Sequence, residues 1–149
     1  NPASYSGHLA LARWWHEQGL APPKRVTQTG GHEHSLQALL AGQIDLAAFD
    51  SQGWTLLRRA YPEALDACCL VAQTPAQPAP PLCLPALAAP EAAAWRQGFT
   101  AAQIALQDGR LQAEGLGLVG FHAVDETAYE DLRTQIQAQI QAGQILHKV

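Results

Sequence analysis

The sequence predicts an α/β fold in which a mainly parallel sheet is flanked by helices. Two nearly continuous apolar runs, residues 44–49 and 67–72, are typical of strands that are covered on both faces. A shorter strand candidate, residues 24–28, precedes them. Helical patterns separate these three segments. Strands that alternate with helices of this length imply right-handed βαβ units and therefore a parallel sheet.

Glycines bound the helices of the first half. An apolar-rich stretch, residues 9–15, predicts a helix that ends near Gly19. A Gly-Gly pair at residues 30–31 opens a second helix, which Gly42 ends. A third helix is expected over residues 52–60, directly before the last apolar run.

Composition changes abruptly after Gln73. Residues 74–81 hold four prolines and no charged side chain, so this stretch must be extended. We therefore expect three parts: an α/β lobe over residues 1–73, a Pro-rich connector over residues 74–82, and a mostly helical segment over residues 83–149.

The last part contains two helix patterns. Pro90 suits the first turn of a helix, which we expect to continue over residues 91–106. Residues 116–124 form a short strand-like piece. From Thr127 to Ile140, apolar residues recur at spacings of three and four, which indicates an amphipathic terminal helix.

Composition also excludes several classes of function. A net charge of −4, with the nine Lys and Arg residues scattered, argues against nucleic acid as a partner. No apolar stretch approaches the ~20 residues needed to span a bilayer. The three cysteines, Cys68, Cys69 and Cys83, include no CxxC pair, which favours buried free thiols over a disulfide or a zinc site. We expect no cofactor and no metal.

The first candidate site is the helix start Ser4-Tyr5-Ser6-Gly7. A helix N-terminus offers unpaired N–H groups and the positive end of the helix dipole. The two serines add hydroxyl donors, and Gly7 lets a ligand approach the backbone, so an anion can bind here without a formal cation. The alternative is that Ser6 is simply an N-cap.

The second candidate is the turn at residues 27–35, which includes Gly30, Gly31 and His32. Two glycines free the backbone to form a nest of N–H groups, and the ring of His32 adds a donor. The alternatives are a metal site that uses His32 and His34, a catalytic His–Glu pair, and a capped helix start with surface histidines.

The third candidate is Asp50, at the carboxyl end of an apolar strand candidate. In open parallel sheets, ligands bind in the crevice at that edge. Asp50 either caps the next helix through residues 51–53, or lines the cleft and accepts a hydrogen bond from a protonated ligand oxygen or an amine. Construction from βαβ units would bring both helix starts to this same edge.

Together these segments resemble the PhnD-like phosphate/phosphite/phosphonate-binding proteins of ABC importers. The resemblance covers essentially the whole chain, and the Pro-rich connector and residues 118–121 also fit it. Its motifs are Asn1-Pro2-x-Ser4-x-Ser6-Gly7-His8, Thr29-Gly30-Gly31-His32-Glu33-x-Ser35-Leu36 and Gly42-x-x-Asp45-Leu46-Ala47-Ala48-Phe49-Asp50.

The resemblance implies a type II periplasmic-binding-protein fold, with two α/β lobes and a ligand cleft between them. It implies that the phosphorus oxyanion is held by Ser4, Ser6, the Gly7 backbone and His32. Tyr5 stands where such proteins often have a small polar residue, and Asp50 matches a cleft-lining position. The expected ligand-binding set is therefore Ser4, Tyr5, Ser6, Gly7, His32 and Asp50.

The resemblance also implies that the chain begins at the second lobe, and that residues 83–149 return to a first lobe that is incomplete. The sequence contains no Met, which fits a chain that is processed or cut from something larger. The expected consequences are weak ligand binding and self-association through an uncovered apolar face. The location implied is periplasmic or extracytoplasmic.

The function implied is a non-enzymatic one: capture of a small oxyanion and its delivery to an ABC permease. An alternative is the ligand-sensing input domain of a signalling protein. A third is a metal-dependent hydrolase that uses His32, Glu33 and His34.

Overall fold

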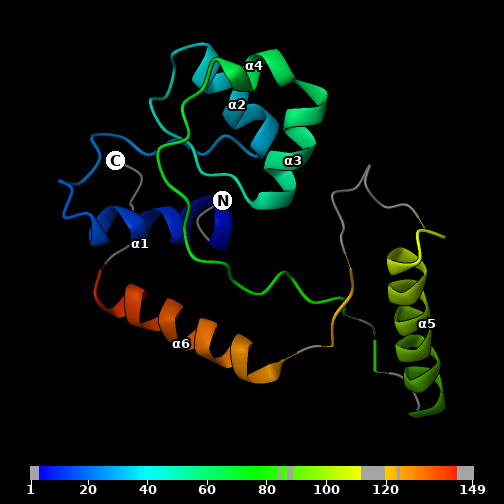
Figure 1. Ribbon diagram of the computed structural model, residues 1–149. Coiled ribbons are helices and arrows are strands. Elements are labelled where there is room, and N and C mark those ends of the chain that lie inside the picture. The colour runs from blue at the N-terminus through cyan, green and yellow to red at the C-terminus, as the bar shows by residue number, and fades with distance from the viewer. Residues whose placement is uncertain (1–3, 84, 87–88, 112–119, 124, 144–149) are drawn as a thin grey trace. The chain divides into compact units, whose positions relative to one another are not determined.

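A computed structural model describes residues 4–83, 85–86, 89–111, 120–123 and 125–143 (Figure 1). Their regular structure is helical. A π-helical turn, η1, leads directly into α1, and five further helices follow. The elements are η1 (Tyr5–Leu9), α1 (Ala10–Glu17), α2 (His32–Leu40), α3 (Ser51–Ala60), α4 (Pro62–Asp66), α5 (Ala89–Gln107) and α6 (Glu126–Gln141).

The chain forms two compact units. One unit comprises residues 1–76 and 130–149, and the other comprises residues 77–129. The first unit holds all the candidate site residues. The assignment of residues 1–73, 74–82 and 83–149 to a lobe, a connector and a return segment stays a prediction.

All the helices predicted from the sequence are confirmed, with small shifts of their ends. Several of the helix ends have a cause in the neighbouring residues. Asp50 caps α3, and Gly42 takes a positive φ of 65° after the end of α2, a conformation in which glycine is favoured. The additional short helix α4 begins at Pro62, whose fixed φ suits the first turn.

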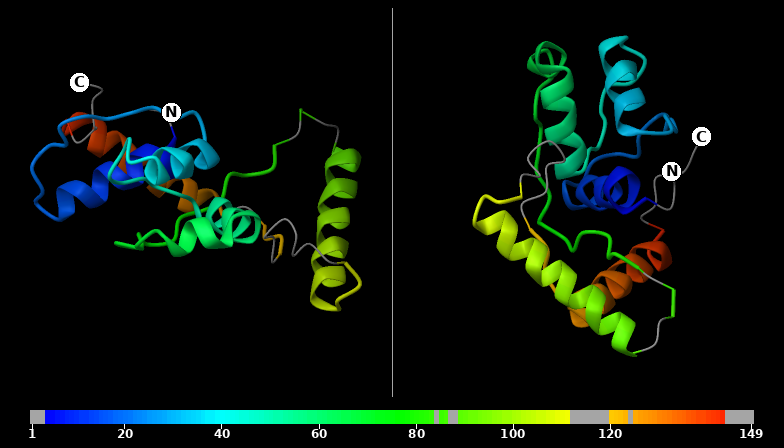
Figure 2. Two further views of the ribbon diagram at one scale, coloured as in Figure 1. Left: turned by 90° about the horizontal axis from the view of Figure 1, so that it is seen from above. Right: turned by 90° about the vertical axis from the view of Figure 1, so that its right-hand side faces the viewer.

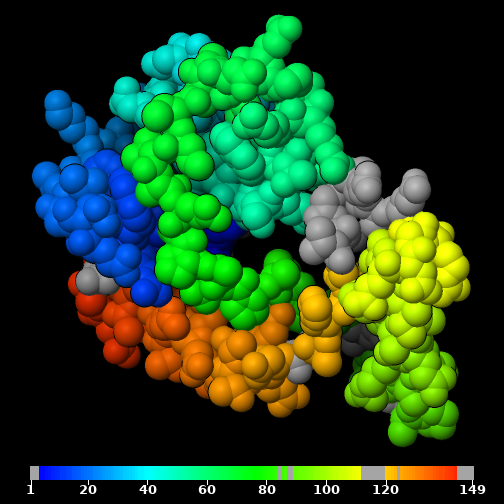
Figure 3. Space-filling model, viewed as in Figure 1, coloured from blue at the N-terminus to red at the C-terminus, as the bar shows by residue number. Residues whose placement is uncertain are grey.

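The core of the first unit lies among α2, α3 and α4. Leu36, Leu57 and Leu65 are its buried members, one from each helix. Phe49, Trp54, Ala64 and Cys68 pack against them. Figures 1 and 2 show α2 and α3 side by side, and in Figure 3 the residues of α2–α4 gather into one continuous mass. This packing fixes how the N-termini of α2 and α3 are placed relative to each other.

The parallel sheet is not confirmed: none of the described residues belongs to a strand. The three segments predicted as strands, residues 24–28, 44–49 and 67–72, lie outside the helices. The last of them begins in the turn that follows α4. A strand needs a neighbour whose N–H and C=O groups complete its ladder, and an apolar run does not supply one. Leu70 and Val71, expected to be covered on both faces, are 67% and 62% exposed.

In the second unit, α5 packs through aromatic side chains. Phe99 lies between Trp95 and Phe121, with ring centroids 6.2 Å and 5.3 Å apart respectively. The side chain of Gln103 accepts a hydrogen bond from the Phe121 N–H. Most of the strand-like piece predicted over residues 116–124 lies outside the described residues. Of the helices that the structure describes, none is both long and apolar enough to cross a membrane.

The three cysteines carry free thiols. The predicted burial is wrong for two of them, because Cys69 and Cys83 are exposed and only Cys68 is partly covered. Cys68 is covered because it packs against the α2–α4 core, whereas Cys69 follows it into the extended segment.

Leu36 and Leu40 provide a matched test of this core on one helix. Leu36 is 2% exposed and Leu40 is 49% exposed. We expect Leu36→Ala to lower the free energy of unfolding by about 2–5 kcal/mol, because it leaves a cavity between α2 and α3. Leu40→Ala should change it by less than about 0.5 kcal/mol. Urea unfolding monitored by circular dichroism measures both, and equal losses would contradict the assigned core.

Candidate ligand-binding site

Asp50 stands at the N-terminus of α3 and caps it. Its backbone is extended (φ −75°, ψ 162°), and its Oδ1 accepts a hydrogen bond of 2.5 Å from the Gly53 N–H. The Trp54 N–H donates to the Asp50 carbonyl at 2.8 Å. The helix-cap alternative weighed for Asp50 is thus confirmed. Only one side of the carboxylate is used by the cap, so Oδ2 is left to meet other partners.

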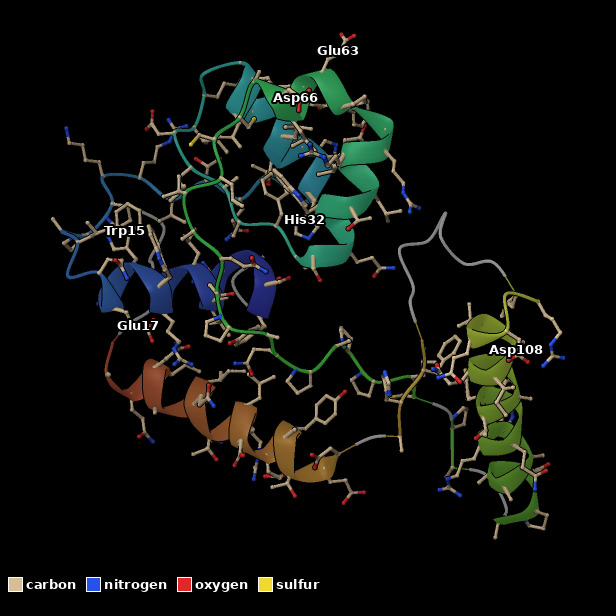
Figure 4. The ribbon with its side chains drawn as sticks, viewed as in Figure 1. Trp15, Glu17, His32, Glu63, Asp66 and Asp108 are labelled. Carbon is tan, nitrogen blue, oxygen red and sulfur yellow. The ribbon has the colours of Figure 1, made fainter. Side chains whose placement is uncertain are left out.

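His32 meets that second oxygen. It is the first residue of α2, and its Nε2 lies 2.8 Å from Asp50 Oδ2. Figure 4 shows its side chain where α2 comes close to α3. The imidazole also packs against Phe49, with centroids 5.7 Å apart, and Phe49 packs in turn against Trp54 at 5.9 Å. Because Phe49 and Trp54 pack on the leucine core, the core holds the His32 ring in place.

The turn before α2 is braced by its own side chains. The hydroxyl oxygens of Thr29 and Ser35 lie 2.6 Å apart, and Ser35 Oγ donates to the Gly31 carbonyl at 3.0 Å. Gly30 adopts a φ of 91°, in the region that favours glycine. These contacts set the direction in which α2 begins, and with it the position of His32.

Ser6 brings the first helix start to the same carboxylate. Ser6 was one candidate for the N-cap, but the cap is Ser4, whose Oγ accepts from the Gly7 N–H at 3.1 Å. The Ser6 side chain is therefore not used by the cap, and its hydroxyl contributes to the lowered pKa of Asp50. Three helix starts thus converge on one side chain.

These contacts decide the charge of Asp50. Burial alone would raise its pKa. Hydrogen bonds from the Gly53 N–H, from His32 and from Ser6, together with the charge of the imidazole, outweigh burial and lower the pKa below its ordinary value. Asp50 is therefore an anion at neutral pH. The side chains of His32 and Asp50 remain 29% and 42% exposed, so a small solute reaches them from solvent.

Tyr5 does not join this cluster. Its hydroxyl interacts with Arg13 of α1. The pKa of Arg13 is raised chiefly by its hydrogen bond to Glu17, 2.6 Å long, and more weakly by Tyr5. Arg13 also donates to Gln135 of α6 at 2.8 Å. Arg13 thus joins α1 to α6, and Tyr5 interacts with Arg13.

The two residues that follow His32 face elsewhere. Glu33 accepts a hydrogen bond of 2.5 Å from the hydroxyl of Tyr61, and this bond raises the pKa of Tyr61. His34 lies over the glycine turn, with its Nδ1 3.7 Å from the position that a Cβ on Gly30 would take. Within the described residues, no three His, Cys, Asp or Glu side chains gather closely enough to hold a metal ion.

Gly53 is a site residue that sequence reasoning missed. A Cβ at this position would lie 2.6 Å from Cδ2 of His32 and 3.0 Å from Asp50 Oδ1. Glycine therefore allows α3 to approach the imidazole, and its N–H also binds the carboxylate. The spacing of Asp50 and Gly53 was a usable signal for a helix cap, but the contact with His32 depends on how α2 packs against α3.

A family model places the chain among known proteins. The family described as "ABC transporter, phosphonate, periplasmic substrate-binding protein" matches residues 1–129. The chain belongs to this family. Searches of curated proteins and of solved structures returned no match. The PhnD-like resemblance is thus confirmed.

Membership of the family of phosphonate-binding substrate-binding proteins gives the general role. Such proteins are the periplasmic components of ABC transporters, which capture a small molecule and work with a membrane permease. Substrate-binding proteins are in general not enzymes. The family is also consistent with the predicted α/β class, although the described residues show helices alone.

Gly53→Ala tests how closely α3 approaches His32 in this substrate-binding protein. The added methyl group must displace the imidazole, since the two would otherwise lie 2.6 Å apart. We expect the His32–Asp50 hydrogen bond to be lost and the ring resonances of His32 to shift in NMR spectra. Gly98→Ala is the control, because a Cβ there meets nothing within 4 Å. It should leave His32 unchanged and stabilise α5 by up to about 1 kcal/mol. Unchanged His32 resonances in Gly53→Ala would contradict the geometry.

The lowered pKa of Asp50 makes its contribution to stability depend on pH. Because the folded pKa lies below the unfolded value of about 3.9, the contribution is fully present above that value and is lost as pH falls through the folded pKa. We expect the wild-type chain to be more stable than Asp50→Asn at neutral pH, with the difference shrinking in acid. Urea unfolding across a pH series measures this. A difference that does not change with pH would refute the charge assigned to Asp50.

Proposed function

We propose that this chain binds a small phosphorus oxyanion, such as a phosphonate, phosphite or phosphate, as the solute-binding component of an ABC importer. The single observation that carries the proposal is the 2.8 Å contact of His32, at the start of α2, with the Asp50 carboxylate at the start of α3, where the Ser6 hydroxyl also acts on the carboxylate. Donors that hold a carboxylate suit another oxyanion, since both offer several anionic oxygen acceptors.

The proposed donors are neutral groups at helix N-termini. Ser6 lies in the first turn of the continuous helix formed by η1 and α1, and His32 begins α2. The N-termini of α2 and α3 add the positive ends of their dipoles, which favour an anion without Lys or Arg. Neutral donors suit a transport protein, because a ligand held without a full counter-charge is more easily released to the permease.

The proposed binding shell retains the residues expected from the sequence. Ser6 and His32 supply side-chain donors, and Ser4 and Gly7 frame the turn that holds Ser6. The Gly7 N–H is bound to Ser4 Oγ, so its use by a ligand requires Ser4 to turn away. A direct contact from Tyr5 likewise requires its hydroxyl to leave Arg13. Asp50 lies among the same donors.

Calorimetric titration with methylphosphonate, phosphite and phosphate tests the proposal. We expect saturable binding of at least one of them. Ser6→Ala and His32→Gln should each weaken that binding roughly tenfold or more, because each removes a hydrogen bond to a charged ligand. His34→Gln is the matched control, since this exposed histidine lies over the glycine turn, and it should leave the affinity unchanged.

Two results would reject the proposal. One is the absence of heat with all three anions. The other is an equal loss of affinity in His34→Gln and His32→Gln, because the binding would then not depend on the imidazole beside Asp50. The expectations of weak binding and of self-association are measured in the same samples, through the dissociation constant and by sedimentation.

A further inference from the structure

Every donor identified at this site already has an acceptor within the chain. The Gly53 N–H binds Asp50 Oδ1, His32 Nε2 faces Asp50 Oδ2, and the Ser6 hydroxyl acts on the same carboxyl, whose pKa it helps to lower. An ionised carboxylate offers about four lone-pair positions, so it accommodates all three donors at once. The anion that these donors hold in this structure is part of the protein.

The two carboxylate oxygens have different tasks. Oδ1 belongs to the cap of α3, and releasing it would expose the N-terminus of that helix. Oδ2 faces the imidazole of His32 and takes no part in the cap of α3. An incoming anion therefore gains His32 by replacing Oδ2, while the cap keeps the carboxylate group beside the ligand. The two negative charges then lie close together and repel each other.

We propose that Asp50 is an internal competitor of the ligand: its carboxylate holds Ser6 and His32 while the site is empty, and it weakens the binding of any anion that must take them over. This inference rests on the proposed function. In this role Asp50 lowers the affinity for the ligand, whereas a residue that attracts the ligand would raise it.

The surroundings of Asp50 limit which other charges contribute. Within the described part of the chain, the groups that act on it are Ser6 from η1, His32 from α2 and the Gly53 N–H from α3, and of these His32 is ionisable. The neighbouring carboxylate of Glu33 is bonded to Tyr61 instead. Asp45, in the apolar run that precedes Asp50, is exposed. Removing the Asp50 charge thus alters the hydrogen-bonding partner of His32, whereas removing the charge of Glu33 or Asp45 does not.

Asp50→Asn separates the charge from the cap, because Asn caps a helix about as well as Asp. At a fixed pH of about 7.5, we expect this variant to bind methylphosphonate roughly tenfold more tightly than the wild type. Asp45→Asn removes the same charge elsewhere and should bind within about twofold of the wild type. Asp50→Ser, another good cap without charge, should tighten binding as Asp50→Asn does.

The outcomes separate this inference from the function on which it rests. If the wild type binds as tightly as both Asp50 variants, or more tightly, Asp50 is not a competitor of the ligand. The proposed function would still stand. No binding of methylphosphonate, phosphite or phosphate by the wild type or by either variant overturns the proposed function, and the inference with it.

A second measurement reports on the exchange itself. When the ligand takes His32 and Ser6, Asp50 loses two of the hydrogen bonds that stabilise its charged form and gains an anion beside it. Carbon-detected NMR of the Asp50 carboxyl should therefore show its titration moving to higher pH when methylphosphonate is added. A titration that stays in place under saturating ligand contradicts the exchange.

Discussion

The hydrogen bonds at the Asp50 carboxylate tie three helix starts together. An N-cap normally satisfies one helix end with one side chain, and here the same side chain also receives the imidazole of His32 and the hydroxyl of Ser6. Burial works against the charge, and the donors more than offset it, so the carboxylate stays ionised. The proposed side-chain donors Ser6 and His32 both act on this one group.

The leucine core makes that convergence possible. Leu36 and Leu57 hold α2 against α3, and the aromatic pair Phe49 and Trp54 fills the space between the core and the imidazole. Gly53 then admits the ring where any larger residue would collide with it. A polar cluster that is open to solvent is in this way given a defined geometry by apolar packing beneath it.

Local signals explain what the sequence could predict. Helix ends depend on groups a few residues away, such as the Asp50 cap or the glycine after α2, and those helices are confirmed. A strand depends on a partner far along the chain, and the apolar run that contains Leu70 and Val71 carries no sign of whether one is present. The meeting of Ser6 and His32 was expected at a sheet edge. Among the described residues they act instead on the Asp50 side chain, which His32 reaches because α2 packs against α3.

In the proposed site, an anion binds at uncharged hydroxyl and helix N-terminal donors and at His32, and it competes with the protein's own Asp50 carboxylate for them. This arrangement fits a protein of the phosphonate-binding family, whose ligand must be captured and then released to a permease. It also gives one residue, Asp50, both a structural task at α3 and an influence on the ligand. Substitutions that remove the whole side chain therefore mix the two effects.

A crystal structure of the chain grown with methylphosphonate tests the central claim most directly. We expect tetrahedral density within hydrogen-bond distance of Ser6 Oγ and His32 Nε2, with the Gly53 N–H still bound to Asp50. Density at another surface, or a His32 ring turned away from both Ser6 and Asp50, would contradict it.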